Sequence, residues 1–217
     1  MDLILYLLKQ MGKKKEIQDT STEEKIKEAA LKVFSKKGYA AARTRDIAEE
    51  AGINLALLNY YFRSKEKLFE LIMMESVQHF AASIKDILND EKTPLEEKMT
   101  LLASHYIDRL IREPNFPLFI LSEIQARPDK LIQRMGMKDA LKKSVFTRQL
   151  DQMLTKQKLS INPLHFLMNF IGITVFPFIG KPLLKGVAGL SEKEFNQLME
   201  ERKKLIPLWI KTILHTN

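Results

Sequence analysis

The stretch over residues 44–65, TRDIAEEAGINLALLNYYFRSK, places the strongest constraint on what this chain can fold into. Its pattern predicts one helix over about residues 44–51 and a second over about residues 55–62. Gly52 stands between them, where the chain must turn sharply and where glycine adopts a positive φ without steric cost. Two short helices around a tight turn form a helix-turn-helix, whose second helix can enter the major groove of DNA.

The second predicted helix has an inner and an outer face. Ile53, Leu58 and Phe62 are expected to pack against the first helix of the chain, through Val33 and Phe34. The outer face is then free to meet base edges, since an asparagine amide can pair with adenine and an apolar group can contact the thymine methyl. The candidates for base contacts are Asn54, Leu55, Ala56, Asn59 and Tyr60.

Phosphate contacts are expected around the same motif. Thr44, Tyr61 and Lys65 lie near the ends of the predicted helices, where backbone N–H groups also favour anions. Arg45 can reach a guanine edge or a phosphate. Taken alone, the aromatic run at residues 60–62 is more typical of a core than of a contact surface, so the prediction rests on the joint pattern.

The charge of the chain agrees with a polyanionic partner. The formal net charge is +8, and residues 12–67 hold 13 Lys or Arg against 9 Asp or Glu, a net charge of +4 (13 − 9). Half of the excess therefore lies around the predicted helix-turn-helix. Basic patches attract nucleic acids, but solvated surface lysines give the same excess, so the charge supports the motif and does not stand without it.

The periodicity of the whole chain predicts an all-α protein of about nine helices. A capping box at residues 21–24 opens the first helix, and Gly38 ends it. Thr44 and Ser64 are expected to cap later helices, and a second capping box is expected at residues 93–96. Further helix starts are expected at Pro114, at Pro128 for a helix to about residue 158, at Asn162 and at Ser191. We predict three parts: an arm over residues 1–20, a helix-turn-helix DNA-binding domain over 21–67, and a helical C-terminal domain over 68–217.

Neither a signal peptide nor a membrane span is expected. Residues 1–15 lack a basic n-region and a small-x-small cleavage site; they are a flexible leader, an extra amphipathic turn, or a segment upstream of a true start at Met11. The longest apolar stretch, residues 164–180, contains His165, Asn169 and Pro177 and falls short of the roughly 20 apolar residues of a span. The absence of cysteine is compatible with a reducing cytoplasm.

Over residues 23–72 the chain resembles the TetR family of bacterial transcriptional regulators. The segments that carry the resemblance are Ala29-Ala30 with Phe34, Lys37-Gly38-Tyr39, Thr44-Arg45-Asp46-Ile47-Ala48, Ala51-Gly52-Ile53 and the run from Tyr60 to Phe69. The resemblance implies a cytoplasmic homodimer, in most members a repressor, whose two recognition helices read the halves of a palindromic operator. It also implies that the C-terminal domain binds a small molecule that releases the DNA. At the matching positions it implies a base-reading Arg45 and phosphate contacts from Thr44 and Lys65.

The reading face departs from the family pattern. Asn59 stands where the family usually has tyrosine, and residues 55–57 are three apolar residues where the family often has Lys, Gly, Pro or Thr. The predicted reading face is therefore less polar than usual, which leaves the operator sequence open.

The resemblance places the dimer interface in the last two long helices, over about residues 163–188 and 191–215. Each contains a broad apolar band, and so much apolar surface suits an isologous dimer. The alternative is that these helices close the core of a monomer. Pro177, Pro182 and Pro207 are expected to kink them.

A pocket for a small apolar or amphipathic ligand is expected between the middle helices, over about residues 95–154. His105, Tyr106 and Arg109 offer polar anchors at helical spacing. The candidates for the apolar lining are Phe116, Phe119, Met135, Met137, Phe146 and Met153. Each of these residues is by itself more typical of a core or a surface position.

No catalytic, metal or cofactor site is expected. The sequence offers no nucleophile–base pair and no phosphate loop, and His105, His165 and His215 have no partner at a ligand spacing. We therefore predict a DNA-binding transcriptional regulator, not an enzyme. The alternatives are a regulator without small-molecule control or with a protein partner, and an all-α enzyme or small-molecule carrier with an incidental helix-turn-helix.

Overall fold

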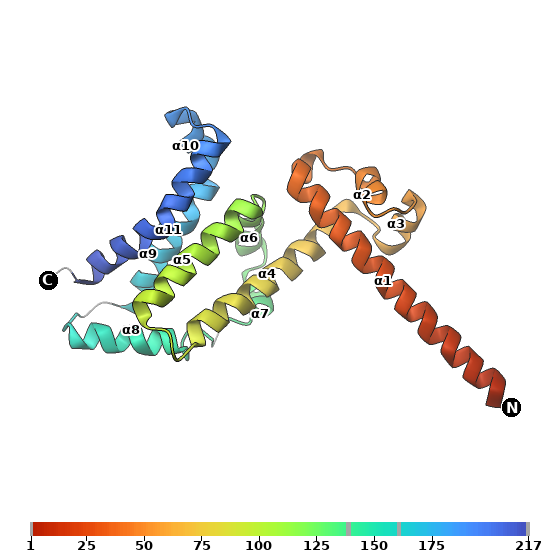
Figure 1. The fold of residues 1–217 in the computed structure, drawn as a ribbon, viewed down its shortest axis with the longest axis horizontal. Helices are drawn as coiled ribbons and strands as arrows, with labels where there is room; N and C mark the ends of the chain where they lie inside the picture. The colour runs from red at the N-terminus through yellow and green to blue at the C-terminus, as the bar shows by residue number, and fades with distance from the viewer. Residues whose placement is uncertain (1, 138–139, 160–161, 216–217) are drawn as a thin grey trace. The chain divides into compact units, whose positions relative to one another are not determined.

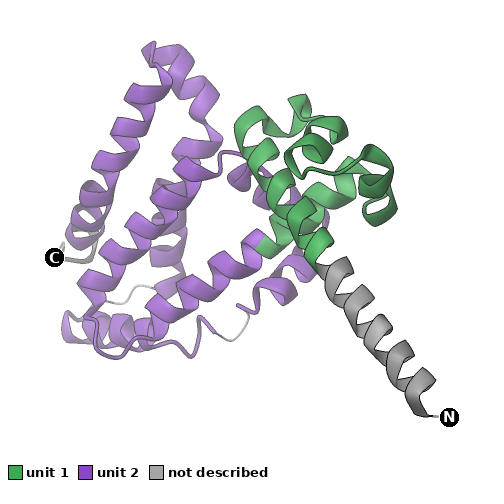
Figure 2. Cartoon of the chain, turned by 45° about the vertical axis from the view of Figure 1, so that its right-hand side comes forward, with its two compact units in different colours: residues 1–75 green, residues 76–217 purple. Residues whose placement is uncertain are grey.

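A computed structural model describes residues 2–137, 140–159 and 162–215 of the chain, and the side chains of residues 21–137, 140–159 and 162–212. Over these ranges the secondary structure consists of eleven α-helices, without strands (Figure 1). The chain divides into two compact units, residues 1–75 and residues 76–217 (Figure 2). The predicted all-α class is confirmed, and the predicted number of helices is too low by two.

The N-terminal unit contains α1 (Asp2–Ala41), α2 (Thr44–Glu50), α3 (Leu55–Tyr61) and the start of α4 (Lys65–Asn89). Gly38 has φ of 74° and interrupts α1 at the predicted stop. The predicted arm over residues 1–20 lies outside the residues whose side chains are described. The predicted domain border after residue 67 and the border between the units both fall within α4.

The core of the N-terminal unit holds α2 and α3 in place. Each has only seven residues, and isolated helices shorter than about 12 residues are marginal in water. Leu58 and Phe62 are 1% and 8% exposed and lie in one cluster with Val33 and Phe34 of α1, as predicted. Gly52 has φ of 67° with open space at its Cβ position, so the backbone conformation alone requires a glycine there.

The C-terminal unit is organised around α5, which packs against α8, α9 and α11. Its helices after α4 are α5 (Leu95–Arg112), α6 (Phe116–Ala126), α7 (Pro128–Met135), α8 (Val145–Lys156), α9 (Pro163–Ile179), α10 (Lys181–Ala188) and α11 (Glu192–His215).

Two predicted helices are wrong because each breaks at a glycine. The helix expected over residues 128–158 ends at Gly136, which adopts the left-handed conformation. A new helix starts after Ser144, whose Oγ accepts from the Thr147 N–H at 3.1 Å. The helix expected to run on from Asn162 ends at Gly180, and Pro182 lies in the first turn of α10 instead of kinking a longer helix.

The break at Gly180 also bears on the predicted absence of a membrane span. Within the described ranges, no helix by itself has the length and apolar character that crossing a membrane requires. Only α9 and α10 taken together have this length and apolar character, and these two helices are bent by 66° relative to each other.

The predicted helix starts are confirmed where a side chain caps the helix. The caps with such hydrogen bonds are Ser64, Asn162 and Ser191. The expected capping box at Thr93 is wrong, because the Thr93 hydroxyl donates to the Asp90 carboxylate and Pro94 occupies the cap position of α5.

Pro177 inside α9 is accommodated by a side chain from α11. Proline has no N–H, so the carbonyl of Ile173, one turn earlier, lacks its helical donor. The Arg202 guanidinium donates from Nη2 to this carbonyl, and it also lies 4.9 Å from the Trp209 ring. The contact between α9 and α11 therefore supplies the hydrogen bond that the proline removes.

We predict that Arg202→Met lowers the free energy of unfolding by about 1–3 kcal/mol, because it leaves the Ile173 carbonyl without a donor. In a Pro177→Ala background the restored N–H bonds that carbonyl, so the same substitution costs less. Urea unfolding followed by circular dichroism measures both differences. Equal costs in the two backgrounds would show that the guanidinium acts only through the Trp209 ring.

Candidate functional site

Helix α3 presents an outer face without a charged side chain. Ala56, Asn59 and Tyr60 of the predicted base-contacting set are exposed, Tyr60 to 75%. Leu55 is half-buried. Leu57 was not among the predicted contacts, yet it is 36% exposed on the same helix. The outer face of α3 therefore consists mainly of hydrocarbon, one amide and one phenol.

Asn54 has a structural role at the start of α3. Its Oδ1 accepts from the Leu57 N–H at 2.8 Å, which makes it the N-cap of the helix. A bidentate contact with adenine needs both the oxygen and the amino group of an asparagine. Since the oxygen of Asn54 already serves the cap, the geometry favours Asn59 for such a contact.

Helix α2 is capped differently from the prediction. The cap position is Arg43, and its backbone N–H donates to Asp46 Oδ2 at 3.0 Å, so the expectation that Thr44 caps the helix is wrong. The hydrogen bond from Lys37 is the first cause that lowers the pKa of Asp46. Thr44 is half-buried in the first turn, and Arg45 next to it is exposed.

Lys65 is held inside the N-terminal unit. Its Nζ donates to the carbonyls of Tyr39 and Ala42 at 3.0 and 3.1 Å, and it lies 4.4 Å from the centre of the Tyr39 ring. Two of its three donors therefore fix the end of α1 against the start of α4. The predicted phosphate contact has one donor left, and a substitution of Lys65 would disturb the fold of this unit.

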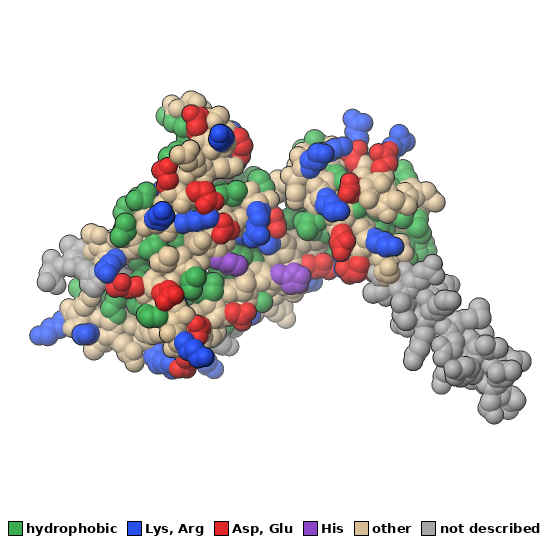
Figure 3. All heavy atoms as spheres, in the orientation of Figure 1, with side chains coloured by type: hydrophobic (Ala, Val, Ile, Leu, Met, Phe, Trp, Pro, Cys, Tyr) green, Lys and Arg blue, Asp and Glu red, His purple; other side chains and the backbone are tan. Residues whose placement is uncertain are grey.

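The remaining predicted phosphate contact, Tyr61, is half-buried, and its ring meets the Tyr60 ring edge-on at 5.3 Å. Basic and acidic side chains alternate over the visible face of the N-terminal unit (Figure 3). Lys37 pairs with Asp46 at 2.9 Å. Within the described residues no ion pair involves the exposed Arg45 or Arg63, so both guanidinium groups are available to an anionic partner.

The C-terminal unit contains an apolar cavity of about 510 Å³, a volume typical of small-molecule sites. Helices α4 to α9 enclose it together with the α7–α8 connection. Every described side chain that lines it is apolar except Tyr106. The predicted lining residues found there are Tyr106, Phe116, Met135, Met137 and Phe146, whereas Phe119 and Met153 do not line it.

Of the described lining residues, Tyr106 is the one that brings a hydroxyl into this cavity. Burial raises the pKa of Tyr106 to about 12, so the phenol stays protonated at neutral pH. Its ring packs edge-on against Phe80 at 4.8 Å and Phe170 at 6.0 Å, which fixes its direction. A ligand in the cavity would therefore meet one hydroxyl and otherwise hydrocarbon.

The predicted anchors His105 and Arg109 do not line the cavity; they join α5 to α4. His105 Nε2 lies 2.7 Å from Ser83 Oγ, and its ring stacks on Phe80 at 5.3 Å. Burial is the first cause that lowers the pKa of His105, followed by the charges of Arg109 and Arg112. The imidazole is therefore neutral in the folded protein at neutral pH.

Arg109 reaches the beginning of the C-terminal unit. Its Nη2 donates to the Ser76 carbonyl at 3.2 Å and pairs with Glu113 at 3.0 Å, and Glu113 accepts from the Ser76 hydroxyl at 2.8 Å. The guanidinium lies 4.8 Å from the Phe116 ring. Because Phe116 lines the cavity, this cluster lies directly behind the cavity wall.

Large apolar side chains remain exposed on the last three helices. They are Leu164, Met168 and Phe176 of α9, Leu183, Leu184 and Val187 of α10, and Leu198, Leu205, Leu208 and Trp209 of α11. The predicted apolar band of α9 is divided between two faces, since Leu167, Ile171 and Val175 line the cavity. Sequence reasoning missed these cavity residues because a helix that is apolar all round does not reveal which face is turned inward.

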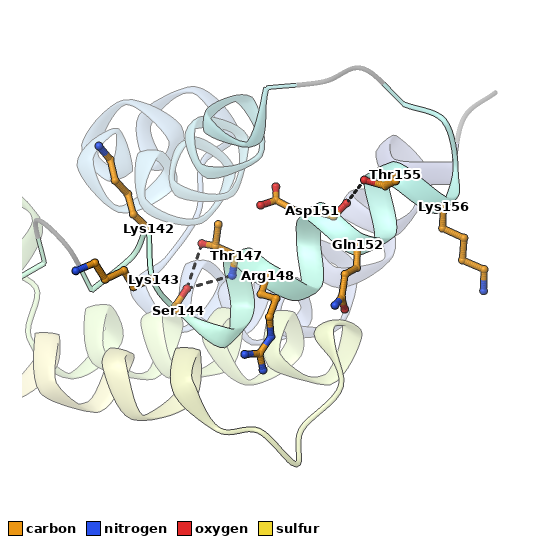
Figure 4. A pocket seen from close by; sticks show the side chains of 9 residues that line it. All are labelled: Lys142, Lys143, Ser144, Thr147, Arg148, Asp151, Gln152, Thr155 and Lys156. Carbon is orange, nitrogen blue, oxygen red and sulfur yellow. Dashed lines mark hydrogen bonds between the residues drawn. The ribbon is translucent and has the colours of Figure 1, made fainter.

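A second hollow, of about 580 Å³, lies on the surface along α8. Its lining residues are Lys142, Lys143, Ser144, Thr147, Arg148, Asp151, Gln152, Thr155 and Lys156, and the charged side chains point in different directions (Figure 4). Ser144 caps α8, and Thr155 donates to the Asp151 carbonyl at 2.8 Å. Arg148 pairs with Glu91 at 3.3 Å, so these polar groups serve local contacts, and no set of the labelled side chains converges on one point (Figure 4).

Comparison with known proteins agrees with this geometry. Residues 26–72 match the family model of the bacterial regulatory proteins of the tetR family. The chain is 21% identical to the probable HTH-type transcriptional regulator YttP of Bacillus subtilis, over 90% of this chain and 95% of that protein. Over residues 26–72 the chain is similar to the TetR family of transcriptional regulators. It is also 32% identical to the HTH-type transcriptional repressor NicS of Pseudomonas putida, over 49% of this chain and 50% of that protein.

The fold of this chain is also found among solved structures. The transcriptional regulator FadR of Bacillus subtilis, solved in complex with stearoyl-CoA, aligns with a TM-score of 0.50 and 19% sequence identity. The alignment covers 84% of this chain and 96% of FadR. At this identity the likeness concerns the fold.

We predict that the stability of this chain falls as the pH drops below about 6.5, partly because of His105. The unfolded chain takes up a proton near pH 6.5, whereas the folded chain does so at lower pH. The contribution of the neutral imidazole is thus complete above about pH 6.5 and is lost as the pH falls toward the folded pKa.

Urea unfolding at pH 7.5 and 5.5, followed by the fluorescence of the single tryptophan, Trp209, measures this loss. His105→Gln should show a smaller loss than the unaltered chain, and His79→Gln, at an exposed position of α4, should show the full loss. Identical losses in all three proteins would contradict the role of His105.

Proposed function

We propose that this chain is a repressor that binds a palindromic operator as a homodimer and releases it when an apolar ligand fills the cavity. The observation that carries the DNA-binding part is the capped, uncharged outer face of α3, which stands in a unit where Arg45 and Arg63 are free of ion pairs within the described residues. The partners in this proposal are double-stranded DNA, a second copy of the chain and a small ligand, and the location is the cytoplasm. A catalytic activity is not part of it.

The base contacts belong to the proposal as residues of α3 and its neighbours. Ala56, Asn59 and Tyr60 would face base edges, with Leu55 at the side of the face. Arg45 would reach a base edge or a phosphate, and Thr44, Tyr61 and the remaining donor of Lys65 would contact phosphates. Exposed positive charge in the same unit as an apolar reading face supports this arrangement, since phosphate contacts position a protein on DNA while base contacts select the sequence.

Homodimer formation through about residues 163–188 and 191–215 is supported by exposed side chains. Leu164, Met168 and Leu208 are 54%, 61% and 58% exposed, and they belong to α9 and α11, which pack against each other. Contiguous exposed apolar surface on a protein marks an interaction site. A second copy of the same chain would cover this surface on both partners at once.

The ligand proposed for the cavity is apolar or amphipathic, with a long hydrocarbon part. Among the described residues, the lining is hydrocarbon with the single Tyr106 hydroxyl and offers no cation for a charged head group, so such a group would have to lie at the edge of the cavity. FadR of Bacillus subtilis, which shares the fold, was solved with stearoyl-CoA, whose acyl chain fits this description. His105 and Arg109 would act behind the cavity wall instead of touching the ligand.

DNA binding is tested with the duplex upstream of the chain's own reading frame. We predict that Arg45→Ala weakens binding by about 1–3 kcal/mol, because an Arg contact to a base edge or phosphate is lost. Fluorescence anisotropy measures the affinity at several salt concentrations, and binding should weaken steeply with salt. The matched control is Lys156→Ala, at an exposed position of α8. Lys65 is unsuitable as a test because it supports the fold.

The stoichiometry of the same complex tests the dimer, since two chains per palindrome are expected. An affinity that Arg45→Ala leaves unchanged would contradict the proposed reading head. Binding that persists in a strictly monomeric protein would contradict the dimer.

Ligand binding is tested by filling the cavity. We predict that stearoyl-CoA raises the melting temperature of the chain and releases the duplex, and that Ile120→Trp abolishes both effects because the indole occupies the space of the acyl chain. Leu118→Trp, on the exposed side of the same helix, should retain both effects. Circular dichroism establishes that each variant is folded. Stearoyl-CoA effects that survive Ile120→Trp would place the ligand elsewhere, and a chain that binds neither stearoyl-CoA nor stearate would favour a regulator without this control.

A further inference from the structure

The outer face of α3 lacks the side chains that select G·C pairs. Guanine is read mainly by Arg or Lys, which donate to its O6 and N7, and the cytosine amino group is read by Asp or Glu. Residues 55–61, LALLNYY, contain none of these four residue types. The groups that remain on this helix match the two features of an A·T pair, the 5-methyl group of thymine and the N6/N7 edge of adenine.

The packing of α3 determines which side chains meet the DNA. Leu58 and Phe62 are buried in the core of the N-terminal unit, which sets the rotation of the helix about its axis. Ala56 and Tyr60, four residues apart, then point outward on the same side, with Leu57 and Asn59 at its borders. The surface that faces away from the core is therefore known residue by residue.

Few polar groups lie near this surface, and one of them already caps the helix. The Asn54 oxygen caps α3, so Asn59 is the asparagine of this helix with its whole amide group available. Leu57 keeps 36% of its surface exposed in a unit where exposed Arg45 and Arg63 offer positive charge. An exposed leucine in a unit with exposed cations is suited to a partner with anionic phosphates and with apolar groups in its groove, as the major groove of DNA has at thymine methyl groups.

We propose that the part of the half-site under α3 is rich in A·T pairs, with Leu57 and Ala56 against thymine 5-methyl groups and Asn59 on an adenine edge. This inference rests on the proposed DNA-binding function and adds the class of sequence that the chain selects. In this proposal a guanine within the operator is contacted by Arg45 of α2 and not by a residue of α3.

The test replaces thymine by uracil, which removes the 5-methyl group and leaves the base-pairing groups unchanged. The operator is first narrowed by footprinting on the upstream duplex, and each thymine of a half-site is then replaced singly. At the positions under α3, uracil should weaken binding about fourfold, the factor expected for one buried methyl group. Thymines outside the protected half-sites serve as the control positions.

Two variants assign the methyl contact to a side chain. With Leu57→Ala, the uracil duplex and the thymine duplex should bind equally at one position, while the unaltered chain distinguishes them. With Asn59→Ala, discrimination between adenine and guanine at one position should fall about tenfold, the order of a lost bidentate contact. Leu118→Ala, at an exposed leucine of α6, should behave as the unaltered chain. Melting curves establish that Leu57→Ala is folded.

The outcomes separate this inference from the function beneath it. A chain that binds the duplex with the same affinity for thymine and uracil at every position of the half-site overturns the methyl contact and leaves DNA binding intact. A uracil effect that Leu57→Ala does not remove overturns the assignment to this side chain. If the chain binds no specific duplex, both the proposed function and this inference are wrong.

Discussion

The burial of Leu58 and Phe62 against Val33 and Phe34 is the contact on which the reading head depends. Helices α2 and α3 are too short to persist alone, so their helical state is a consequence of tertiary packing. The same burial sets the rotation of α3 and thereby selects which of its side chains face outward. Substituting a core residue would consequently affect the reading surface without touching it.

Hydrogen bonds from polar side chains add to the stabilisation of the reading head by its core. The Asn54 side chain satisfies a backbone N–H at the start of α3, and Lys65 donates to two carbonyls at the end of α1. Each such hydrogen bond contributes about 1 kcal/mol, and leaving a buried group unpaired costs more. Residues that look like DNA contacts in a helix-turn-helix thus also hold it together, and only substitutions that separate the two roles are informative.

In the C-terminal unit, packing and hydrogen bonds likewise act together, here around the apolar cavity. Aromatic and aliphatic side chains of six helices enclose the cavity, while His105 and Arg109 bind α4 from behind the wall through Ser83 and Ser76. Helix α9 has residues in three environments. Its inner face lines the cavity, and its outer residues are exposed. Its Pro177 is tolerated because Arg202 donates a hydrogen bond to the Ile173 carbonyl, which the proline leaves without a donor. Any ligand that moves Phe80 or Phe116 also acts on the groups that hold α5 to α4.

The sequence by itself determined the all-α class, the turn at Gly52, the inward Leu58 and Phe62, and the caps at Ser64, Asn162 and Ser191, because these follow from periodicity and from local backbone preferences. Tertiary structure decided what depends on distant partners. Breaks at Gly136 and Gly180 escaped detection because glycine is compatible with a helix as well as with its end. The structure directs Lys65 into the N-terminal unit and places His105 and Arg109 outside the cavity. It also divides the apolar residues of α9 between the cavity and the surface. The sequence of one segment does not show these outcomes, because they depend on neighbours from distant parts of the chain.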